Sequence, residues 1–355
     1  RYPLVTGVQT CALPILTGSR KVTNEELIGR FPGKTAEDIV QRTGIEERHW
    51  CGPDETVLDL AANAARKAME SAGVGLADLS GIIVSTSTPL EVSPSLACRL
   101  HHVLSGDGTQ QDIAAHDVLA ACSGWLYALQ QAHDACTARP GTRYLVVTAE
   151  AMSRFLDAGD FDTAIVFGDA ATAVVVEGGP AASGAPLRLH RPLLSARGED
   201  GSILRVGRIE DGRCTPVAMH GVKVFPLAVR QMNTMLREAC ADAGTTMEDL
   251  AWIVPHQANG RIIAAAQQRS GVPVERVVSN VARHGNTSSC SIPIAIAEML
   301  AQGRSGLVGM AAFGGGFTFA AAVAEMGQGT GASTGDRKST RLNSSHEWIS
   351  RMPSS

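Results

Sequence analysis

The sequence has no apolar run long enough to cross a membrane, because charged or polar residues interrupt every hydrophobic segment within a few positions. It also has no basic block, and its 31 Lys and Arg against 35 Asp and Glu give a net charge of −4. A nucleic-acid partner therefore has no electrostatic support. These absences predict a soluble, cytoplasmic protein with neither a membrane nor a nucleic-acid partner.

Cysteine pairs with the CxxC spacing are absent as well. The eight cysteines are scattered singly, which argues against zinc and thioredoxin-type redox motifs and predicts small buried thiols in a reducing compartment. No metal site is predicted, since His256 has no partner at ligand spacing. Aromatic residues make up only 4% of the chain and glycine is frequent, with 37 residues, which is typical of helices packed closely on a sheet.

The two ends of the chain differ from its middle. Residues 1–16 contain an apolar stretch, but Pro3 and Pro14 bracket it and no small-x-small cleavage site follows, so it is not a typical signal peptide. Residues 327–355 are rich in Ser, Gly and Arg and have no periodicity. We predict that 1–16 is a non-native segment and that 327–355 is a non-native, disordered tail, and we leave both out of the predicted fold.

The middle of the chain alternates strand and helix patterns. The first half predicts helices at 58–73 and 122–138 and strands at 81–88, 114–120, 143–150 and, as two short strands around a Gly-Asp turn, 163–178. After a Gly-, Pro- and Ala-rich stretch the order repeats, with strands up to about residue 206 and at 251–255, 276–280 and 306–313, and helices at 222–243, from 258, and at 289–302. This alternation predicts an α/β fold of two similar halves, residues 17–180 and 181–326.

Three polar residues follow predicted strands and precede predicted helices. At such a junction the helix dipole favours a thiolate, so a lowered pKa is expected if Cys122 is a nucleophile, although a cysteine there is also a common core residue. His256 and Asn286 occupy similar loops in the second half, where a structural histidine and an N-cap asparagine are the alternatives. Because such loops share the carboxyl edge of an α/β sheet, all three side chains can converge on one crevice.

Seven sequence strings point to one family when they are taken together. They are QRTGIEERH (41–49), AACSGW around Cys122, IVFGDAATAVVVE (165–177), MHGVKVFPLAV (219–229), PHQANGRII (255–263), RHGNTSSCSIP (283–293) and AAFGGGFTFAAAV (311–323). In their order and spacing, residues 18–326 resemble the β-ketoacyl-acyl-carrier-protein synthase III family of thiolase-like condensing enzymes. The resemblance implies a thiolase fold with five αβαβα layers, a homodimer, and no cofactor apart from the phosphopantetheine of the substrates.

The resemblance also implies roles for the three polar residues. The Cys122 thiolate would attack an acyl thioester, with the backbone N–H groups of Cys122 and Gly315 as the oxyanion hole. His256 and Asn286 would stabilise the enolate that forms when malonyl-ACP, where ACP is the acyl carrier protein, loses CO2. In place of this Asn, elongating synthases have a second His, thiolases have a second Cys, and hydroxymethylglutaryl synthase has a Glu. Asn286 therefore favours the decarboxylating, chain-initiating type. Plant-type polyketide synthases share Cys-His-Asn but have a different Gly-rich loop and a longer chain.

Further residues match the family's substrate path. Arg42 and Thr43 match the lining of the pantetheine tunnel, and Arg261 matches a basic residue that meets the acidic carrier protein, although a solvated helix face is the alternative for it. Asn259 matches a residue that orders water and orients Asn286. These positions imply contact with ACP and with an acyl-CoA or acyl-ACP primer.

Two departures from the family pattern concern the primer. Asp38 and Phe161 stand where members clamp the coenzyme A adenine between Trp and Arg. A carboxylate cannot stack on a base, although Phe161 could offer one face, so poor use of acyl-CoA is predicted. Ser93 replaces a bulky residue that caps the partner's acyl pocket. A longer or bulkier primer is therefore predicted, unless neighbours such as Leu90 refill the space.

The predicted activity is a decarboxylative Claisen condensation that gives a 3-oxoacyl-ACP through an acyl-cysteine, at the start of a fatty-acid or specialised polyketide chain. The alternatives are an acyltransferase that forms an ester or amide, and a non-catalytic subunit that binds carrier proteins. In the family the first strand is central, and here it falls in the foreign-looking segment. We therefore predict low solubility unless Leu4–Thr10 takes its place.

Overall fold

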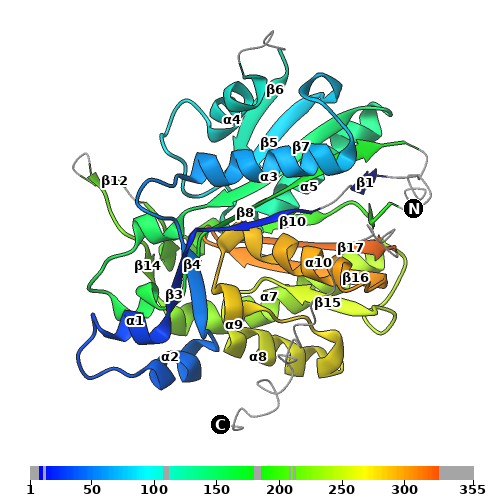
Figure 1. Ribbon diagram of the computed structural model, residues 1–355. Helices are drawn as coiled ribbons and strands as arrows, with labels where there is room; N and C mark the ends of the chain where they lie inside the picture. Colours follow the sequence, from blue (N-terminus) through cyan, green and yellow to red (C-terminus); the bar gives the residue numbers. More distant parts are fainter. Residues whose placement is uncertain are drawn as a thin grey trace.

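The computed structural model describes residues 8–10, 13–106, 112–179, 185–207, 209–210 and 213–327 (Figure 1). The predicted boundary at residue 180 and all but the first residue of the predicted tail at 327–355 lie outside the described residues. No helix in the described ranges is long and apolar enough to span a membrane.

The elements of the first half run from β1 to β8. They are β1 (Val8–Thr10), β2 (Ile15–Thr17), β3 (Arg20–Thr23), α1 (Asn24–Ile28), α2 (Ala36–Thr43), β4 (Glu47–Trp50), α3 (Val57–Ala72), β5 (Gly81–Ser85), α4 (Leu96–Ser105), β6 (Ala114–Val118), α5 (Gly124–Ala138), β7 (Arg143–Glu150), α6 (Phe161–Ala164) and β8 (Ala170–Gly178). Helix α3 shows how sequence sets these bounds: Thr56 and Asp59 form a capping box at its start, and Gly73 ends it at φ +64°.

The second half runs from β9 to β17. Its elements are β9 (Leu187–Leu189), β10 (Leu193–Ala196), β11 (Leu204–Arg205), β12 (Ile209–Glu210), β13 (Arg213–Cys214), β14 (Ala218–Met219), α7 (Gly221–Asp242), β15 (Trp252–Pro255), α8 (Gly260–Ser270), α9 (Val281–His284), α10 (Ser291–Ala301), β16 (Gly306–Gly314) and β17 (Thr318–Met326).

Most described strands join one hydrogen-bonded path, β15-β16-β17-β9-β1-β8-β7-β5-β6. In the first half β5 is parallel to β6 and β7, and β7 is antiparallel to β8; in the second half β15 is parallel to β16, and β16 is antiparallel to β17. The two halves thus repeat a parallel-then-antiparallel arrangement, and β9 and β1 connect them. The expectation of two similar α/β halves is confirmed.

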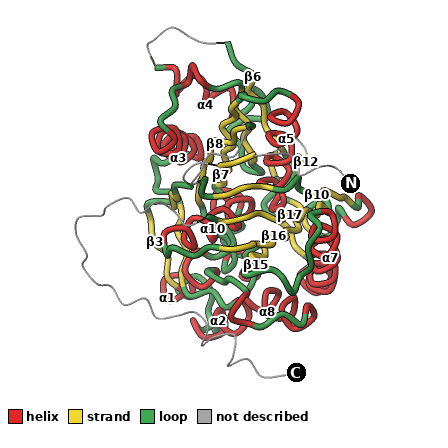
Figure 2. Tube along the Cα trace, turned by 90° about the vertical axis from the view of Figure 1, so that its right-hand side faces the viewer, coloured by secondary structure: helices red, strands yellow, loops and turns green. Residues whose placement is uncertain are grey.

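Three hydrophobic clusters define the layers of the fold. One lies between α3, α4 and one face of β5, β7 and β8, and a second holds α5 and α10 between strands of both halves. The third lies between α7, α8 and the far face of β15, β16 and β17. This order gives the five αβαβα layers of the thiolase fold. Figure 2 shows the strands running through the middle of the molecule, with α3 on one side and α5 and α7 on the other.

Leaving the first 16 residues out of the predicted fold was wrong for Val8–Thr10 and for Ile15–Leu16, which form strands of the sheet. Strand β1 pairs with β8 and β9 at the centre of the sheet, and β2 pairs with β8. The place of a central strand is therefore filled, which is the condition set for avoiding low solubility. Residues 4–7 of the segment Leu4–Thr10 lie outside the described part.

Two predicted strands are absent from the described chain. Residues 163–167 belong to α6 and the turn after it, since Asp160 caps a short helix there and only Phe167 forms an isolated bridge, to Asn286. Residues 276–280 make one bridge, from Val277 to Ile253. The Gln257 side chain donates to the Val278 carbonyl and accepts from the Asn280 N–H, so it takes the bonds that a neighbouring strand would use.

Candidate active site

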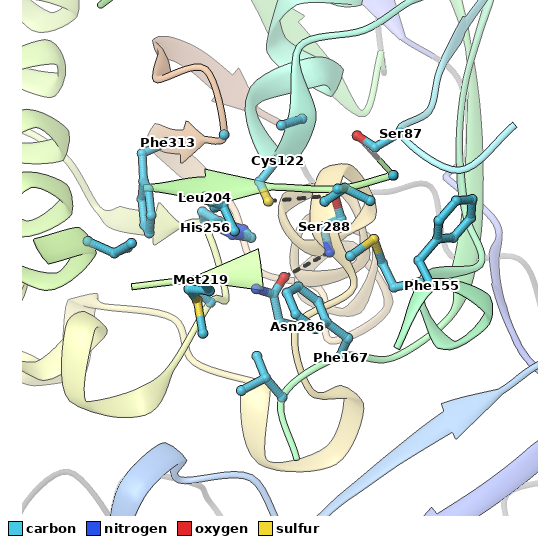
Figure 3. A pocket seen from close by; sticks show the side chains of 18 of the residues that line it. Ser87, Cys122, Phe155, Phe167, Leu204, Met219, His256, Asn286, Ser288 and Phe313 are labelled. Atoms are coloured by element: carbon cyan, nitrogen blue, oxygen red, sulfur yellow. Dashed lines mark hydrogen bonds between the residues drawn. The ribbon is translucent and has the colours of Figure 1, made fainter. Parts of the chain in front are cut away.

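A cavity of about 1320 Å³ opens between the two halves, and Cys122, His256 and Asn286 all line it (Figure 3). Cys122 comes from the first half and the other two residues come from the second. The predicted convergence of three strand-to-helix loops on one crevice is thus present in the structure. Its apolar walls include Met152, Phe155, Leu204, Val206 and Phe225.

Cys122 sits in a 3₁₀ turn, η2 (Ala121–Ser123), between β6 and α5. Ala121 before it has φ +46°, a left-handed conformation that is costly for a residue with a side chain. The last residue of β16, Gly314, packs directly on this turn. A Cβ on Gly314 would lie 2.6 Å from the Cys122 backbone nitrogen, so only glycine allows this approach.

The predicted lowering of the Cys122 thiol pKa is wrong. Removal of the sulfur from water raises this pKa to about 12, and the nearby Glu150 carboxylate adds to the rise. The Ser288 hydroxyl, which donates to Sγ at 3.5 Å, and the backbone N–H of Cys122 act in the opposite direction. The helix start alone therefore does not make a thiolate here.

His256 follows β15 directly, and its ring is buried against Phe313. Nδ1 lies 2.6 Å from Ser291 Oγ, which also accepts a bond from the Gln257 N–H. Nε2 is buried and has no hydrogen-bond partner among the described residues. Burial lowers the pKa of His256 to about 3, so the imidazole is neutral at physiological pH. Its Nε2 is free to face a substrate atom.

Asn286 is held in place by the first half of the chain. Its backbone N–H donates to the Val166 carbonyl, and its carbonyl accepts from the Gly168 N–H. Its side-chain oxygen accepts a bond from the Ser288 N–H at 2.9 Å (Figure 3), which fixes the amide orientation. The amide NH2 group is therefore the part of Asn286 that can donate into the cavity.

Most of the other predicted site residues also line this cavity; they are Arg42, Thr43, Asn259, Arg261 and Gly315. Asn259 caps α8 by accepting from the Arg261 N–H, and it donates to the Arg42 carbonyl. Its predicted contact with Asn286 is not among its hydrogen bonds. Arg42 forms an exposed ion pair with Asp162 at 2.9 Å.

The two residues at the predicted adenine clamp have other contacts. Asp38 bonds the Thr35 hydroxyl and N–H in the capping box of α2, and these bonds lower the pKa of its carboxyl. Phe161 packs edge-on against Phe31 at 5.1 Å, with Lys34 over its ring. Neither residue lines the cavity, and neither does Ser93, whereas Leu90 beside it does.

Sequence reasoning missed three residues around the site. Ser291 contacts the His256 ring, Ser288 links Asn286 to Cys122, and Glu150 bonds Ser288 from the end of β7. The polar run TSSCS directly before an apolar helix, and a carboxylate that ends an apolar strand, were the available signals. Within the described ranges no three His, Cys, Asp or Glu side chains gather as metal ligands.

Comparison with known proteins shows which family the chain belongs to. The family model for the 3-oxoacyl-[acyl-carrier-protein] synthase III C terminal matches residues 240–326, and that for 3-oxoacyl-[acyl-carrier-protein] synthase III matches 116–189. A β-ketoacyl-[acyl-carrier-protein] synthase III of Rhizorhabdus wittichii is 41% identical over 327 residues, which cover 88% of this chain and 98% of the relative. One from Sphingopyxis alaskensis is 40% identical over 308 residues, covering 85% and 94%.

Solved structures agree as well. The 3-oxoacyl-(acyl carrier protein) synthase III of Pseudomonas aeruginosa matches with a TM-score of 0.83 and 31% identity, covering 91% of this chain and 99% of that one. A priming β-ketosynthase of a polyketide biosynthetic pathway matches with a TM-score of 0.81 and 33% identity, covering 92% and 99%. The chain belongs to the 3-oxoacyl-[acyl-carrier-protein] synthase III family of thiolase-fold proteins.

Proposed function

We propose that this protein is an acyl-transferring condensing enzyme, which joins an acyl thioester primer to malonyl-ACP with loss of CO2 and gives a 3-oxoacyl-ACP. The observation that carries this proposal is the meeting of one thiol and two neutral donors, Cys122, His256 and Asn286, in a single apolar cavity. The family membership and the names of the relatives support it.

In the first half-reaction the Cys122 sulfur attacks the thioester carbonyl, a carbon–sulfur bond to Cys122 forms, and the primer's carrier leaves as a thiol. The negative charge on the carbonyl oxygen needs donors that are already in position. The backbone N–H groups of Cys122 and Gly315 are our candidates, because both residues line the cavity and Gly314 permits their close approach.

In the second half-reaction malonyl-ACP loses CO2, the carbon of the remaining enolate forms a bond to the acyl carbonyl carbon, and the bond from that carbon to Cys122 Sγ breaks. His256 and Asn286 are suited to the enolate oxygen because both offer N–H donors without a positive charge. A neutral imidazole, with its pKa lowered to about 3 by burial, stabilises the anion and has no extra proton to give to the carbanion. Ser291 beside Nδ1 favours the tautomer with hydrogen on Nε2, because Ser291 Oγ already accepts from Gln257 and keeps its own hydrogen for Nδ1.

The primer is proposed to be larger than acetyl and to arrive on ACP. A cavity of about 1320 Å³ with mostly apolar walls exceeds the ordinary size of a small-molecule site. Phe161 contacts Phe31, Lys34 and Arg42 and does not line the cavity, so its ring already has partners where a coenzyme A adenine would stack. Arg261, exposed on the first turn of α8, is a candidate contact for the acidic carrier protein.

We also infer a cytoplasmic homodimer that needs no cofactor beyond the phosphopantetheine of its substrates. Strand β6 pairs with β5 alone among the described strands, which leaves an edge for a second copy. Leu119 directly after it is exposed, as is Val92. Four of the seven described cysteines are buried and all seven are free thiols, as suits a reducing compartment.

Intact-protein mass spectrometry tests this function. The wild-type protein and Cys122→Ser are incubated with acyl-CoAs and acyl-ACPs of increasing chain length, and malonyl-ACP is then added. We expect a mass gain in the wild type only, largest with acyl-ACPs longer than acetyl, and its discharge with release of CO2. Loading without decarboxylation supports an ester- or amide-forming acyltransferase instead, and no loading by folded protein supports a non-catalytic subunit.

A further inference from the structure

A buried carboxylate lies behind the Cys122 thiol. Glu150, at the end of β7, is 0% exposed. Its Oε2 accepts bonds from the Ser87 N–H at 2.9 Å and the Thr88 hydroxyl at 3.1 Å, and its Oε1 accepts from the hydroxyls of Ser288 and Ser289. No Lys or Arg of the described chain forms a salt bridge with it. Burying an anion without a cationic partner costs stability, so a carboxylate of this kind is expected to have a function.

Ser288 joins this carboxylate to the thiol. Its Oγ lies 3.1 Å from Glu150 Oε1 and 3.5 Å from Cys122 Sγ. One hydroxyl has one hydrogen to donate and lone pairs to accept with. When the hydrogen points to the Glu150 carboxylate, the oxygen is free to accept the Cys122 S–H. The three groups then form a continuous path of two hydrogen bonds.

The backbone is shaped to make this path. Among the described residues, only Ala121 and Ser288 have a left-handed φ without being glycine, +46° and +52°. Ala121 precedes the thiol and Ser288 contacts it, so both strained positions border Cys122. Strain of this kind persists where the surrounding structure requires it, and it is common at functional sites.

We propose that Glu150, acting through Ser288, takes the proton from the Cys122 thiol as the sulfur becomes a nucleophile. For acyl transfer this inference rests on the proposed function. Burial raises the pKa of Glu150 to about 7, which lets it hold a proton near physiological pH. His256 is unsuited to this task, because burial lowers its pKa to about 3.

The proton and electron count closes within the site. The Cys122 proton moves to Ser288 Oγ while the Ser288 hydroxyl proton moves to Glu150 Oε1, and the Cys122 electron pair forms the new carbon–sulfur bond. When the tetrahedral intermediate collapses, the bond to the departing sulfur breaks. Glu150 returns its proton through Ser288 to that sulfur, which leaves as a thiol.

The groups that face Glu150 come from three elements. Cys122 lies in η2, and Cys290 lies in the 3₁₀ turn η6 (Ser288–Cys290), where burial and the Glu150 charge raise its thiol pKa. The loop after β5 contributes the uncharged Ser87 and Thr88. Glu150 is therefore the group of this cluster that titrates near neutral pH.

The test is the rate at which iodoacetamide alkylates Cys122 in the full chain, measured from pH 5.5 to 9 by peptide mass spectrometry. Cys98 is exposed and serves as an internal reference in each sample. In the wild type we expect the Cys122 rate to rise to a plateau with an inflection near 7. In Glu150→Gln we expect the inflection to disappear and the rate at pH 8 to fall about 100-fold.

A purely electrostatic role for Glu150 makes the opposite prediction. The Glu150 charge raises the thiol pKa, so its removal without loss of a proton acceptor would make Cys122 react faster. An equal or faster alkylation rate in Glu150→Gln would therefore overturn the proposal.

Two serine variants keep the test informative if Glu150→Gln fails to fold. Ser288→Gly removes the linking hydroxyl and suits the left-handed backbone, so we expect it to abolish the inflection as Glu150→Gln does. Ser289→Ala is the matched control, because it removes a hydroxyl from the same oxygen without breaking the path. Since that bond lowers the Glu150 pKa, its loss moves the inflection to higher pH and keeps the plateau.

A wild-type inflection that persists in Ser288→Gly contradicts the path. Alkylation needs no primer and no malonyl-ACP, so it reports on the relay even if the condensing function fails. Conversely, acyl loading with an unchanged pH profile in Glu150→Gln would leave the condensing function standing and reject the relay.

Discussion

The floor of the cavity, formed by Cys122, His256, Asn286 and Ser288, contrasts with its mouth, formed by Leu90, Val92, Leu119 and Val222. The floor is polar and largely buried, and the backbone beside the thiol is strained. The four side chains named for the mouth are apolar and 50% to 91% exposed, beside charged lining residues such as Arg42 and Arg261. A buried polar floor and exposed apolar side chains both differ from the ordinary distribution of residues, in which polar groups face water and large apolar groups do not.

The contrast separates two kinds of requirement. Buried, unpaired donors such as His256 Nε2 cost stability and are retained where a substrate atom will meet them. Exposed apolar side chains around an opening cost the single chain little, and they are typical of surfaces that another molecule covers. We therefore expect floor variants to change chemistry and mouth variants to change association.

The largest expected effect is the loss of a donor from the floor. His256→Ala and Asn286→Ala should each lower the rate of malonyl-ACP decarboxylation by about 10²–10³-fold, because each removes a preorganised N–H from the enolate oxygen. Acyl loading of Cys122 should change much less. Single-turnover loading and CO2 release measure the two steps separately, and an equal loss in both would contradict the division of roles.

The next effect concerns stability at low pH. Folded His256 stays neutral down to about pH 3, whereas an unfolded imidazole binds a proton near 6.5, so the unfolded state gains protons first and stability falls as pH drops below 6.5. At pH 4.5 this amounts to about 2–3 kcal/mol. Urea unfolding at pH 7.5 and 4.5 measures this difference. The unfolding free energy of His256→Gln, relative to that of the wild type, should rise by that amount between pH 7.5 and pH 4.5.

Glu150, which lies behind the floor, changes the stability with pH in the opposite direction. Its pKa is raised to about 7, so its contribution to stability is largest below 4.5 and is lost as pH rises towards 7.

The His256→Gln measurement can also contradict the assignment for His256. If the difference in unfolding free energy between His256→Gln and the wild type were the same at pH 7.5 and 4.5, His256 would not be a buried, neutral imidazole.

Gly314 tests how tightly the floor is built. Gly314→Ala places a Cβ 2.6 Å from the Cys122 nitrogen, so the turn must move, at a cost of about 1–3 kcal/mol in unfolding free energy. A shift of this kind near 1 Å lowers acyl loading by about 100-fold. Gly198→Ala is the control, since nothing lies within 4 Å of its Cβ. Equal loading rates in the two variants would contradict the close packing inferred here.

The smallest expected effect on the fold belongs to the mouth. Val222→Ser should change the unfolding free energy by less than about 0.5 kcal/mol, because its side chain is 91% exposed. Leu119→Asp should leave the circular dichroism spectrum unchanged and weaken self-association in sedimentation experiments. An unaltered dimer would remove Leu119 from the interface.

Some of this arrangement was predictable from the sequence and some was not. The strand at 143–150 was predicted with its observed bounds, because its apolar residues alternate between two buried faces and charged residues, Arg143 and Glu150, stand at its ends. The meeting of Cys122, His256 and Asn286 followed from a rule about loops at one sheet edge. Such patterns depend on near neighbours in the chain.

The failures depend on distant contacts. The thiol pKa was misjudged because the helix start is visible in the sequence whereas the burial of the sulfur is not. Glu150 went unnoticed because its partner Ser288 lies 138 residues away. Residues 276–280 have strand-like valines, but only the Val278 N–H bonds a strand, at Ile253, and the Gln257 side chain takes the Val278 carbonyl and the Asn280 N–H.

Strand β1 has a consequence for the order in which the chain is assembled. Val8–Thr10 pairs with Val176–Gly178 on one side and with Leu187 and Arg188 on the other. During synthesis β1 leaves the ribosome long before either neighbour exists. The pairing of β1 with β9 can therefore form only after Arg188 has emerged. Until then the sheet has an exposed edge that a chaperone must protect.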